Sequence, residues 1–191
     1  MGNSLLAVSR MNRKYVVVVR RKIMKKNIFL IGFMGAGKST IARTLKAEYS
    51  MNLVEMDEQI EAEQGMKISE IFATKGEEYF RQLETQLLVN LQQQDNTVVS
   101  CGGGVPMRAC NVEAMRKSGK VVYLSAQPET IYERVKDFHT RPLLEGNMNV
   151  PYITELMNKR LPKYLEAADI TVAVDGKDAA DICREILEKM S

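Results

Sequence analysis

The residues with the clearest chemical potential form the segment Gly32–Ser39, which reads Gly-Phe-Met-Gly-Ala-Gly-Lys-Ser. The segment fits the pattern G-x-x-x-x-G-K-[ST], and it lies between an apolar run and a helical pattern. In that setting the glycines turn backbone N–H groups toward phosphate oxygens, and the helix N-terminus adds partial positive charge. Lys38 is expected to reach the β- and γ-phosphates of ATP, and Ser39 to ligate Mg²⁺ directly. The expected ATP-binding residues of this phosphate loop are Gly35, Ala36, Gly37, Lys38, Ser39 and Thr40.

The phosphate loop alone does not separate kinases from GTPases or motor ATPases. The chain contains no N-K-x-D sequence, which GTPases use to read guanine, and 191 residues are too few for most motor ATPases. The size and the motif therefore favour a kinase that acts on a small molecule or a nucleotide.

A carboxylate, Asp57, directly follows a second short apolar run. Ligands of parallel α/β sheets bind beyond the carboxyl ends of the strands, so the Asp57 side chain is expected near the phosphate loop. There it could accept the proton of an acceptor hydroxyl or orient that hydroxyl for attack. Alternatively Asp57 is a helix N-cap, and the two roles are compatible.

Five short motifs follow one another along the chain: Glu55-Met56-Asp57, Phe80-Arg81, Cys101-Gly102-Gly103-Gly104, Arg141-Pro142-Leu143-Leu144 and Lys159-Arg160. Taken together in their order and spacing, these motifs resemble shikimate kinase. The resemblance runs from about Lys26 to the C-terminus, so it covers nearly all of the chain. It implies phosphorylation of the 3-hydroxyl of shikimate by ATP, which gives 3-phosphoshikimate in aromatic amino-acid biosynthesis.

For the acceptor, the resemblance implies a clamp of two arginines, Arg81 and Arg160, on the substrate carboxylate. Guanidinium groups match carboxylates through two parallel hydrogen bonds, which suits arginine to this task. Each arginine could instead be solvated or form a structural salt bridge. The implied substrate-binding residues are Asp57, Arg81, Gly102, Gly103, Gly104 and Arg160, and the alternative for the three glycines is a flexible turn.

For the phosphate side, the resemblance implies that Arg141 reaches the transferring phosphate from a mobile lid at about residues 137–150. A surface loop is the alternative for this segment. Arg134 matches a position that stacks near adenine, although helical arginines are usually only solvated. The implied catalytic residues are therefore Lys38, Asp57 and Arg141.

Two residues depart from the family pattern on the metal side of the site. Glu55 stands where the family usually has aspartate, and an outer-sphere role toward Mg²⁺ survives the longer side chain because Mg²⁺ keeps several waters. The alternative for Glu55 is an exposed charge at a strand end. Cys101 stands where the family often has threonine, and a thiol is the poorer hydrogen-bond partner.

These residues are positioned by short apolar runs that alternate with helical patterns, which is typical of βαβ units and a parallel sheet. We expect a three-layer α/β/α sandwich with a five-stranded parallel sheet, like the nucleoside monophosphate kinases, of the P-loop kinase type. The expected strands are 27–31, 52–56, 97–100, 120–124 and 170–174. The expected helices are 38–49, 57–64, 68–74, 77–93, 111–117, 128–136, 151–167 and 178–189.

The charge is unevenly distributed along the chain. The net charge is +3, but residues 1–26 hold eight of the 27 basic residues and none of the 24 acidic ones, which leaves −5 on the rest. We therefore expect residues 1–24 to be an extension outside the fold, residues 25–191 to be the kinase domain, and no nucleic-acid surface. No apolar run approaches the ~20 residues that span a membrane.

The three cysteines form no C-x-x-C pair and accompany a single histidine, so the sequence has no zinc pattern. We expect reduced thiols in a cytoplasmic, monomeric enzyme whose partners are ATP and shikimate. A related kinase that acts on gluconate or a nucleotide, and a non-catalytic module that only binds ATP, are the alternatives.

Overall fold

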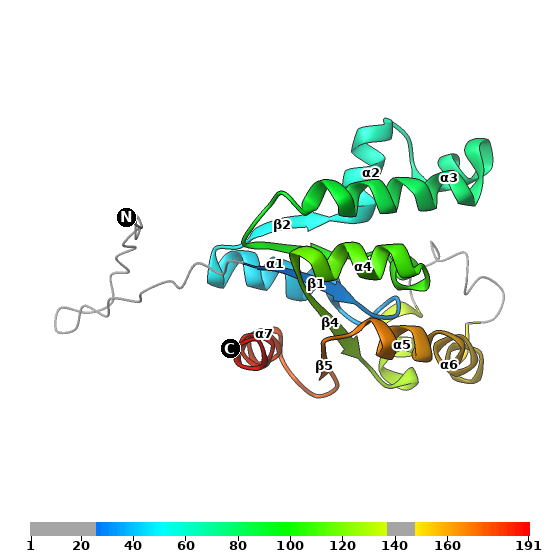
Figure 1. The fold of residues 1–191 in the computed structure, drawn as a ribbon. Coiled ribbons are helices and arrows are strands. Elements are labelled where there is room, and N and C mark those ends of the chain that lie inside the picture. Colours follow the sequence, from blue (N-terminus) through cyan, green and yellow to red (C-terminus); the bar gives the residue numbers. More distant parts are fainter. Residues whose placement is uncertain (1–25, 137–147) are drawn as a thin grey trace, which may run out of the picture.

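The computed structural model describes residues 26–136 and 148–191 and is built on one parallel five-stranded sheet (Figure 1). The strand order is β2-β3-β1-β4-β5, and every neighbouring pair is parallel. The strands are β1 (Asn27–Ile31), β2 (Asn52–Glu55), β3 (Thr97–Ser100), β4 (Gly119–Ser125) and β5 (Ile170–Ala173).

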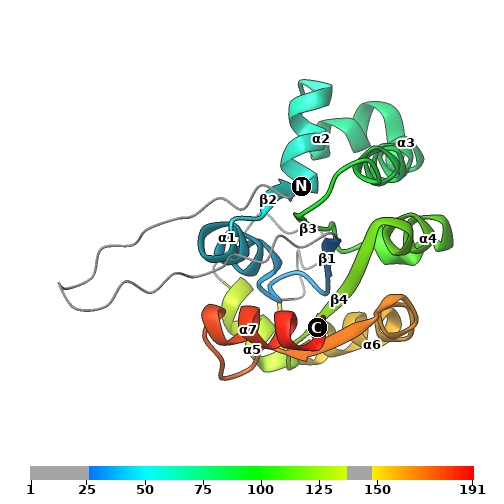
Figure 2. The same cartoon turned by 60° about the vertical axis from the view of Figure 1, so that its left-hand side comes forward.

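Helices cover both faces of this sheet, which makes the three layers that the sequence predicts. Figure 2 shows α1 and α7 on one side of the strands and α3, α4 and α6 on the other. The helices are α1 (Lys38–Tyr49), α2 (Met56–Gln64), α3 (Ile68–Leu91), α4 (Ala109–Ser118), α5 (Pro128–Val135), α6 (Val150–Ala167) and α7 (Ala179–Lys189), with a 3₁₀ turn η1 at Val105–Met107.

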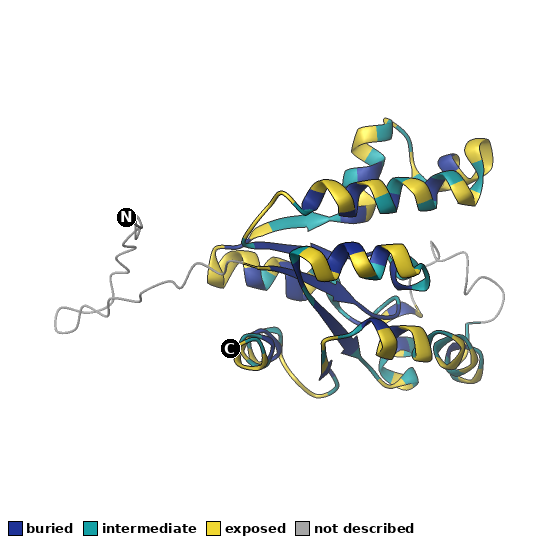
Figure 3. Cartoon of the chain, in the orientation of Figure 1, coloured by how far each residue is buried: buried dark blue, intermediate teal, exposed yellow. Residues whose placement is uncertain are grey.

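The sheet separates two hydrophobic cores. Ile28 and Leu30 of β1 pack into the core formed with α1, α5 and α7, whereas Phe29 and Ile31 pack into the core formed with α2, α3 and α4. These four side chains are fully buried because consecutive residues of a strand point to opposite faces, and both faces are covered. Figure 3 shows the buried strands between helices whose outer sides are exposed.

The expected fold is confirmed, with differences at a few element boundaries. Gly76 interrupts α3 with non-helical dihedral angles (φ 84°, ψ 167°), as the predicted break between two helices requires. The turn η1 was not predicted. Of the predicted lid, residues 137–147 lie outside the described residues, Asn149 caps α6, and Val150 is the first residue of that helix. Within the described ranges, no helix is long and apolar enough to cross a membrane.

Candidate active site

The phosphate loop connects the end of β1 to the start of α1, as the sequence predicts. Gly35 and Gly37 have φ of 78° and 95°, a left-handed backbone that L side chains rarely adopt. The Lys38 Nζ atom donates hydrogen bonds to the carbonyl oxygens of Gly32 (3.0 Å) and Phe33 (3.1 Å), so its ammonium group lies over the loop. The loop thus combines the start of a helix with a lysine folded across it, which is a favourable site for phosphate.

Arg134, in the last turn of α5, lies against the phosphate loop. Its Nη1 atom donates a hydrogen bond of 3.2 Å to the Gly35 carbonyl, and a Cβ on Gly37 would lie 3.7 Å from the same nitrogen. The neighbouring Val135 packs so closely that a Cβ on Gly35 would come within 2.7 Å of its Cγ1 atom. Helix α5 therefore supports the loop from outside, and Arg134 adds a cation beside it.

The predicted metal side of the site is formed by the start of α1 and the carboxyl ends of β2 and β3. The Ser39 hydroxyl donates to Glu55 Oε2 (2.8 Å) and lies 3.3 Å from the Ser100 hydroxyl. Glu55 Oε1 lies 3.3 Å from Arg43 Nη2, and the Glu55 side chain is only 10% exposed. Glu55 is therefore not the exposed strand-end charge that was the alternative, and its longer side chain reaches Ser39 directly.

Cys101 and Ser100 face opposite sides of the sheet, as neighbours at a strand end do. The Cys101 thiol lies 3.9 Å from the Val99 carbonyl oxygen and 4.0 Å from Met115 Sδ, and burial raises its pKa above the ordinary range. The hydroxyl beside Ser39 belongs to Ser100, which we did not predict. The alternation along β3 could have identified it, because it assigns positions 100 and 101 to different faces.

The three glycines after β3 each lie against a side chain of the acceptor side. A Cβ on Gly102 would lie 2.8 Å from Glu84 Oε1 and 3.1 Å from Asp57 Oδ1. A Cβ on Gly104 would lie 2.5 Å from Arg81 Nη1 and 2.8 Å from its Cζ atom. The structure therefore brings the predicted aspartate and arginine together along this glycine run, and side chains at Gly102 and Gly104 would displace them.

Arg81 lies between two glutamates on α3. Its Nη1 atom donates to Glu84 Oε2 (2.8 Å), and its Nη2 and Nε atoms both donate to Glu77 Oε1 (2.8 and 3.1 Å). Glu84 is 1% exposed, and burial raises its pKa while the hydrogen bond from Arg81 opposes that rise. Among the described residues, Glu84 Oε1 has no hydrogen-bond partner.

Glu84 is a functional candidate that we did not predict. The signal was present in the sequence, because position 84 lies on the buried stripe that follows Gly76 in α3 and consists otherwise of Phe80, Leu87, Leu88 and Leu91. A charged residue on an apolar helical stripe requires a partner, and Arg81 lies three residues before it.

Arg160 of α6 also lies against the glycine run. A Cβ on Gly103 would lie 3.5 Å from Arg160 Nη1, and the Arg160 Cζ atom lies 5.8 Å from the centre of the Phe33 ring. Tyr164, one turn further on, donates to the Gly103 carbonyl oxygen at 2.9 Å. Arg160 therefore lies where the phosphate loop meets the glycine run, and Tyr164 anchors that run to α6.

Asp57 is the second residue of α2, because this helix already begins at Met56 and has Glu55 at its N-cap position. The alternative role of Asp57 as an N-cap is therefore wrong. Its Oδ1 atom instead lies toward Gly102, beside Glu84. Arg141, the predicted lid arginine, lies outside the described residues.

Substituting Gly104 by alanine is expected to raise KM for the acceptor by about 10- to 100-fold, since losing one charged hydrogen-bond partner costs about 1.5–3 kcal/mol. The added Cβ would overlap the Arg81 guanidinium and displace it. Steady-state kinetics with each substrate varied in turn would measure the change. KM for ATP serves as the internal control, and an equal rise in both KM values would contradict this explanation.

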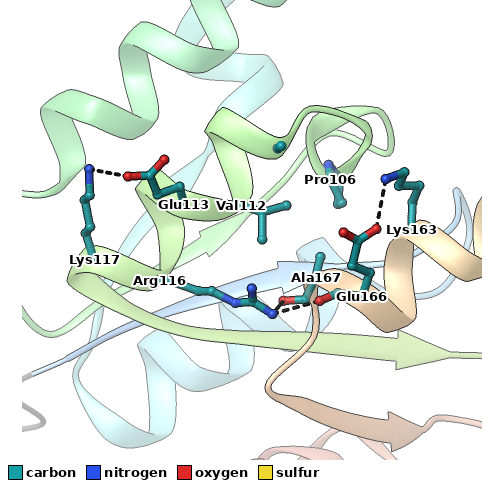
Figure 4. A pocket seen from close by; sticks show the side chains of 9 residues that line it. Pro106, Val112, Glu113, Arg116, Lys117, Lys163, Glu166 and Ala167 are labelled. Carbon is teal, nitrogen blue, oxygen red and sulfur yellow. Dashed lines mark hydrogen bonds and ion pairs between the residues drawn. The ribbon is translucent and has the colours of Figure 1, made fainter.

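A separate groove of about 360 Å³ lies between η1, α4 and α6 (Figure 4). Four of its charged side chains form ion pairs at 2.8 Å, Lys117 with Glu113 and Lys163 with Glu166, and Arg116 donates to the carbonyl oxygens of Glu166 and Ala167. None of the predicted site residues lines it. The groove is therefore not the candidate active site.

Comparison with known proteins agrees with this geometry. Residues 34–191 match the model of the shikimate kinase family. A shikimate kinase from Dehalococcoides mccartyi is 42% identical over 166 residues, which is 87% of this chain and 94% of the relative. One from Persephonella marina is 41% identical over 165 residues, covering 86% of this chain and 99% of the relative.

Solved structures give the same result. The shikimate kinase from Acinetobacter baumannii in complex with shikimate aligns with a TM-score of 0.80 and 34% identity, covering 87% of this chain and 93% of that one. A gluconokinase from Sinorhizobium meliloti aligns with a TM-score of 0.53 and 17% identity, over 88% of this chain and 93% of that one. The second likeness shows a shared fold only.

Proposed function

Because the chain belongs to the shikimate kinase family, we propose that it transfers the γ-phosphoryl group of ATP to the 3-hydroxyl of shikimate. The observation that carries this proposal is the convergence of Asp57, Arg81 and Arg160 on the glycine run next to the phosphate loop. Shikimate carries a carboxylate and ring hydroxyls, so a site that phosphorylates it needs cations near the carboxylate and a proton acceptor near the reacting hydroxyl. The product would be 3-phosphoshikimate, a precursor of the aromatic amino acids.

We propose that Arg81 and Arg160 hold the substrate carboxylate, because guanidinium groups pair with carboxylates through directed hydrogen bonds. Gly102, Gly103 and Gly104 would let the ring approach the backbone closely. Asp57 would accept the proton of the 3-hydroxyl or orient that hydroxyl toward the γ-phosphate. Glu84 would act as a positioning residue, since it holds the Arg81 guanidinium from the buried side.

On the nucleotide side, the proposed ATP-binding residues are Gly35, Ala36, Gly37, Lys38, Ser39, Thr40, Arg134 and Arg141. Lys38 would bind the β- and γ-phosphates, and Arg134 would add positive charge beside the loop. The catalytic role of Arg141 rests on the family resemblance alone.

The oxygen atoms of Ser39, Glu55 and Ser100 fit Mg²⁺, which prefers oxygen ligands and is held in kinases by few protein groups together with substrate phosphates. Ser39 donates a hydrogen bond to Glu55, which leaves a lone pair on its oxygen for direct ligation. Glu55 would act through water. When bound, Mg²⁺ would neutralise charge that develops on the phosphate oxygens.

Assaying ADP release with shikimate, quinate, gluconate and CMP side by side would test the acceptor. We expect shikimate to give a kcat/KM at least about 100-fold above gluconate and CMP, because a site built for one arrangement of polar groups rejects ligands that lack it. Faster turnover of gluconate or CMP would favour a related kinase. Binding of ATP without turnover of any acceptor would favour the non-catalytic module.

We further propose that residues 1–24 lie outside a kinase domain at 25–191, which acts as a cytoplasmic monomer. Deleting residues 1–23 is expected to leave kcat within about two-fold of the full chain, since the deletion keeps all of β1, which begins at Asn27. The same assay on both chains measures this, with sedimentation velocity to determine their oligomeric state. A large loss of kcat would contradict the proposed boundary.

A further inference from the structure

Arg81 is held by two carboxylates that differ sharply in burial. The Glu84 side chain is 1% exposed, whereas the Glu77 side chain is 64% exposed. Glu84 takes one hydrogen bond from Nη1, and Glu77 takes two, from Nη2 and Nε, on a single oxygen. One partner of Arg81 is thus fixed within the protein, and the other lies at its surface.

The contacts of Glu77 use the edge of the guanidinium that is best suited to a carboxylate. Adjacent N–H groups on Nε and Nη2 form the fork that carboxylates bind. The Glu77 carboxylate is 64% exposed and becomes solvated when the pair separates, and Arg81 then keeps its hydrogen bond to Glu84. The ion pair between Glu77 and Arg81 therefore contributes little stability. Glu77 can therefore leave Arg81 at low cost, whereas Glu84 cannot leave without remaining buried and unpaired.

The backbone gives Glu77 a second favourable environment. Gly76 breaks α3 at φ 84° and ψ 167°, so Glu77 is the first residue of the second helical segment. The amino end of a helix stabilises a negative charge whether or not that charge also contacts an arginine. Glu77 would thus retain part of its stabilisation after it releases Arg81.

We propose that Glu77 is an internal competitor for the substrate carboxylate, which occupies Arg81 in the empty enzyme and is displaced when the acceptor binds. This inference rests on the proposed function and deepens it. Glu77 thereby lowers the affinity for carboxylate-bearing acceptors and sets their KM. It takes no part in the phosphoryl transfer itself.

The test is Glu77→Gln, which removes the charge and keeps nearly the same shape. KM for shikimate is expected to fall about two- to five-fold, with kcat and KM for ATP unchanged, which is the scale of an ion pair whose carboxylate is exposed. Glu78→Gln is the matched control, because the adjacent Glu78 is 68% exposed and pairs with Arg108 instead. It is expected to leave KM for shikimate unchanged.

A second measurement separates competition from a positioning role. Calorimetric binding of shikimate is expected to tighten in Glu77→Gln, whereas binding of its neutral methyl ester is not. A higher KM for shikimate in Glu77→Gln would mean that Glu77 positions Arg81, and an unchanged KM would mean that it does not compete; either result overturns the inference. If the wild-type enzyme neither binds nor phosphorylates shikimate, the proposed function fails together with it.

Discussion

Replacing Lys38 with methionine is expected to lower kcat by about 10³-fold or more, which is the scale at which a single cation contributes to phosphoryl transfer. Methionine keeps an unbranched apolar stem but lacks the ammonium group. In the structure, that group lies over the phosphate loop and donates to the carbonyl oxygens of Gly32 and Phe33. Without it, the phosphate loop loses the cation that lies over it.

The measurement is ADP release at saturating ATP and shikimate, with thermal unfolding followed in parallel. Lys46→Met is the matched control, because Lys46 lies in the last turn of the same helix and its side chain is exposed. We expect the control to keep wild-type kcat. Turnover of Lys38→Met within about ten-fold of wild type would show that the loop does not act as a phosphate-transfer site.

The fold could be predicted almost completely, because its central strands are buried on both faces. Such strands read as short continuous apolar runs, and the bounds of β1, α1 and β3 agree with prediction. The observed bounds differ from the predicted ones where backbone pairing between strands, and not the hydropathy of the side chains, decides where an element begins or ends. For example, Gly119 has no side chain to signal a strand, yet its backbone pairs with Asn27 and thereby extends β4.

The sequence predicts which residues form the candidate site but not which of them contact one another. Sequence motifs identified Lys38, Asp57, Arg81 and Arg160, and all four lie at the phosphate loop or the glycine run. The contact between Arg134 and the Gly35 carbonyl joins residues 99 positions apart, so it depends on how α5 packs against the loop. No local pattern encodes such a contact.

The close contact between Glu84 and Gly102 is a further example of long-range packing. Gly102 follows β3 and Glu84 lies on α3, and the two meet only because α3 covers this end of the sheet. The missing Cβ of Gly102 makes room for two carboxylates, Glu84 and Asp57. A glycine run in the sequence predicts close approach but does not tell which side chains approach.

Replacing Asp57 with asparagine is expected to lower kcat by about 10²- to 10⁴-fold, the usual contribution of a general base. Asparagine keeps one acceptor oxygen for the 3-hydroxyl, so KM for shikimate is expected to change less than about ten-fold. The loss should therefore appear mainly in kcat. Single-turnover mixing with saturating ATP and shikimate would isolate the chemical step from product release.

The same variant distinguishes lost chemistry from lost structure. Burial raises the pKa of Glu84, and the negative charge of Asp57 contributes to that rise, so the two carboxylates oppose each other in the folded protein. Removing the Asp57 charge should relieve this repulsion, and the thermal midpoint of Asp57→Asn is expected to equal or exceed that of wild type. Glu63→Gln, on the exposed side of the same helix, should leave both kcat and the midpoint unchanged. A slow Asp57→Asn enzyme with a lowered midpoint would assign Asp57 a structural role, whereas an equally stable but slow one would support its role at the acceptor hydroxyl.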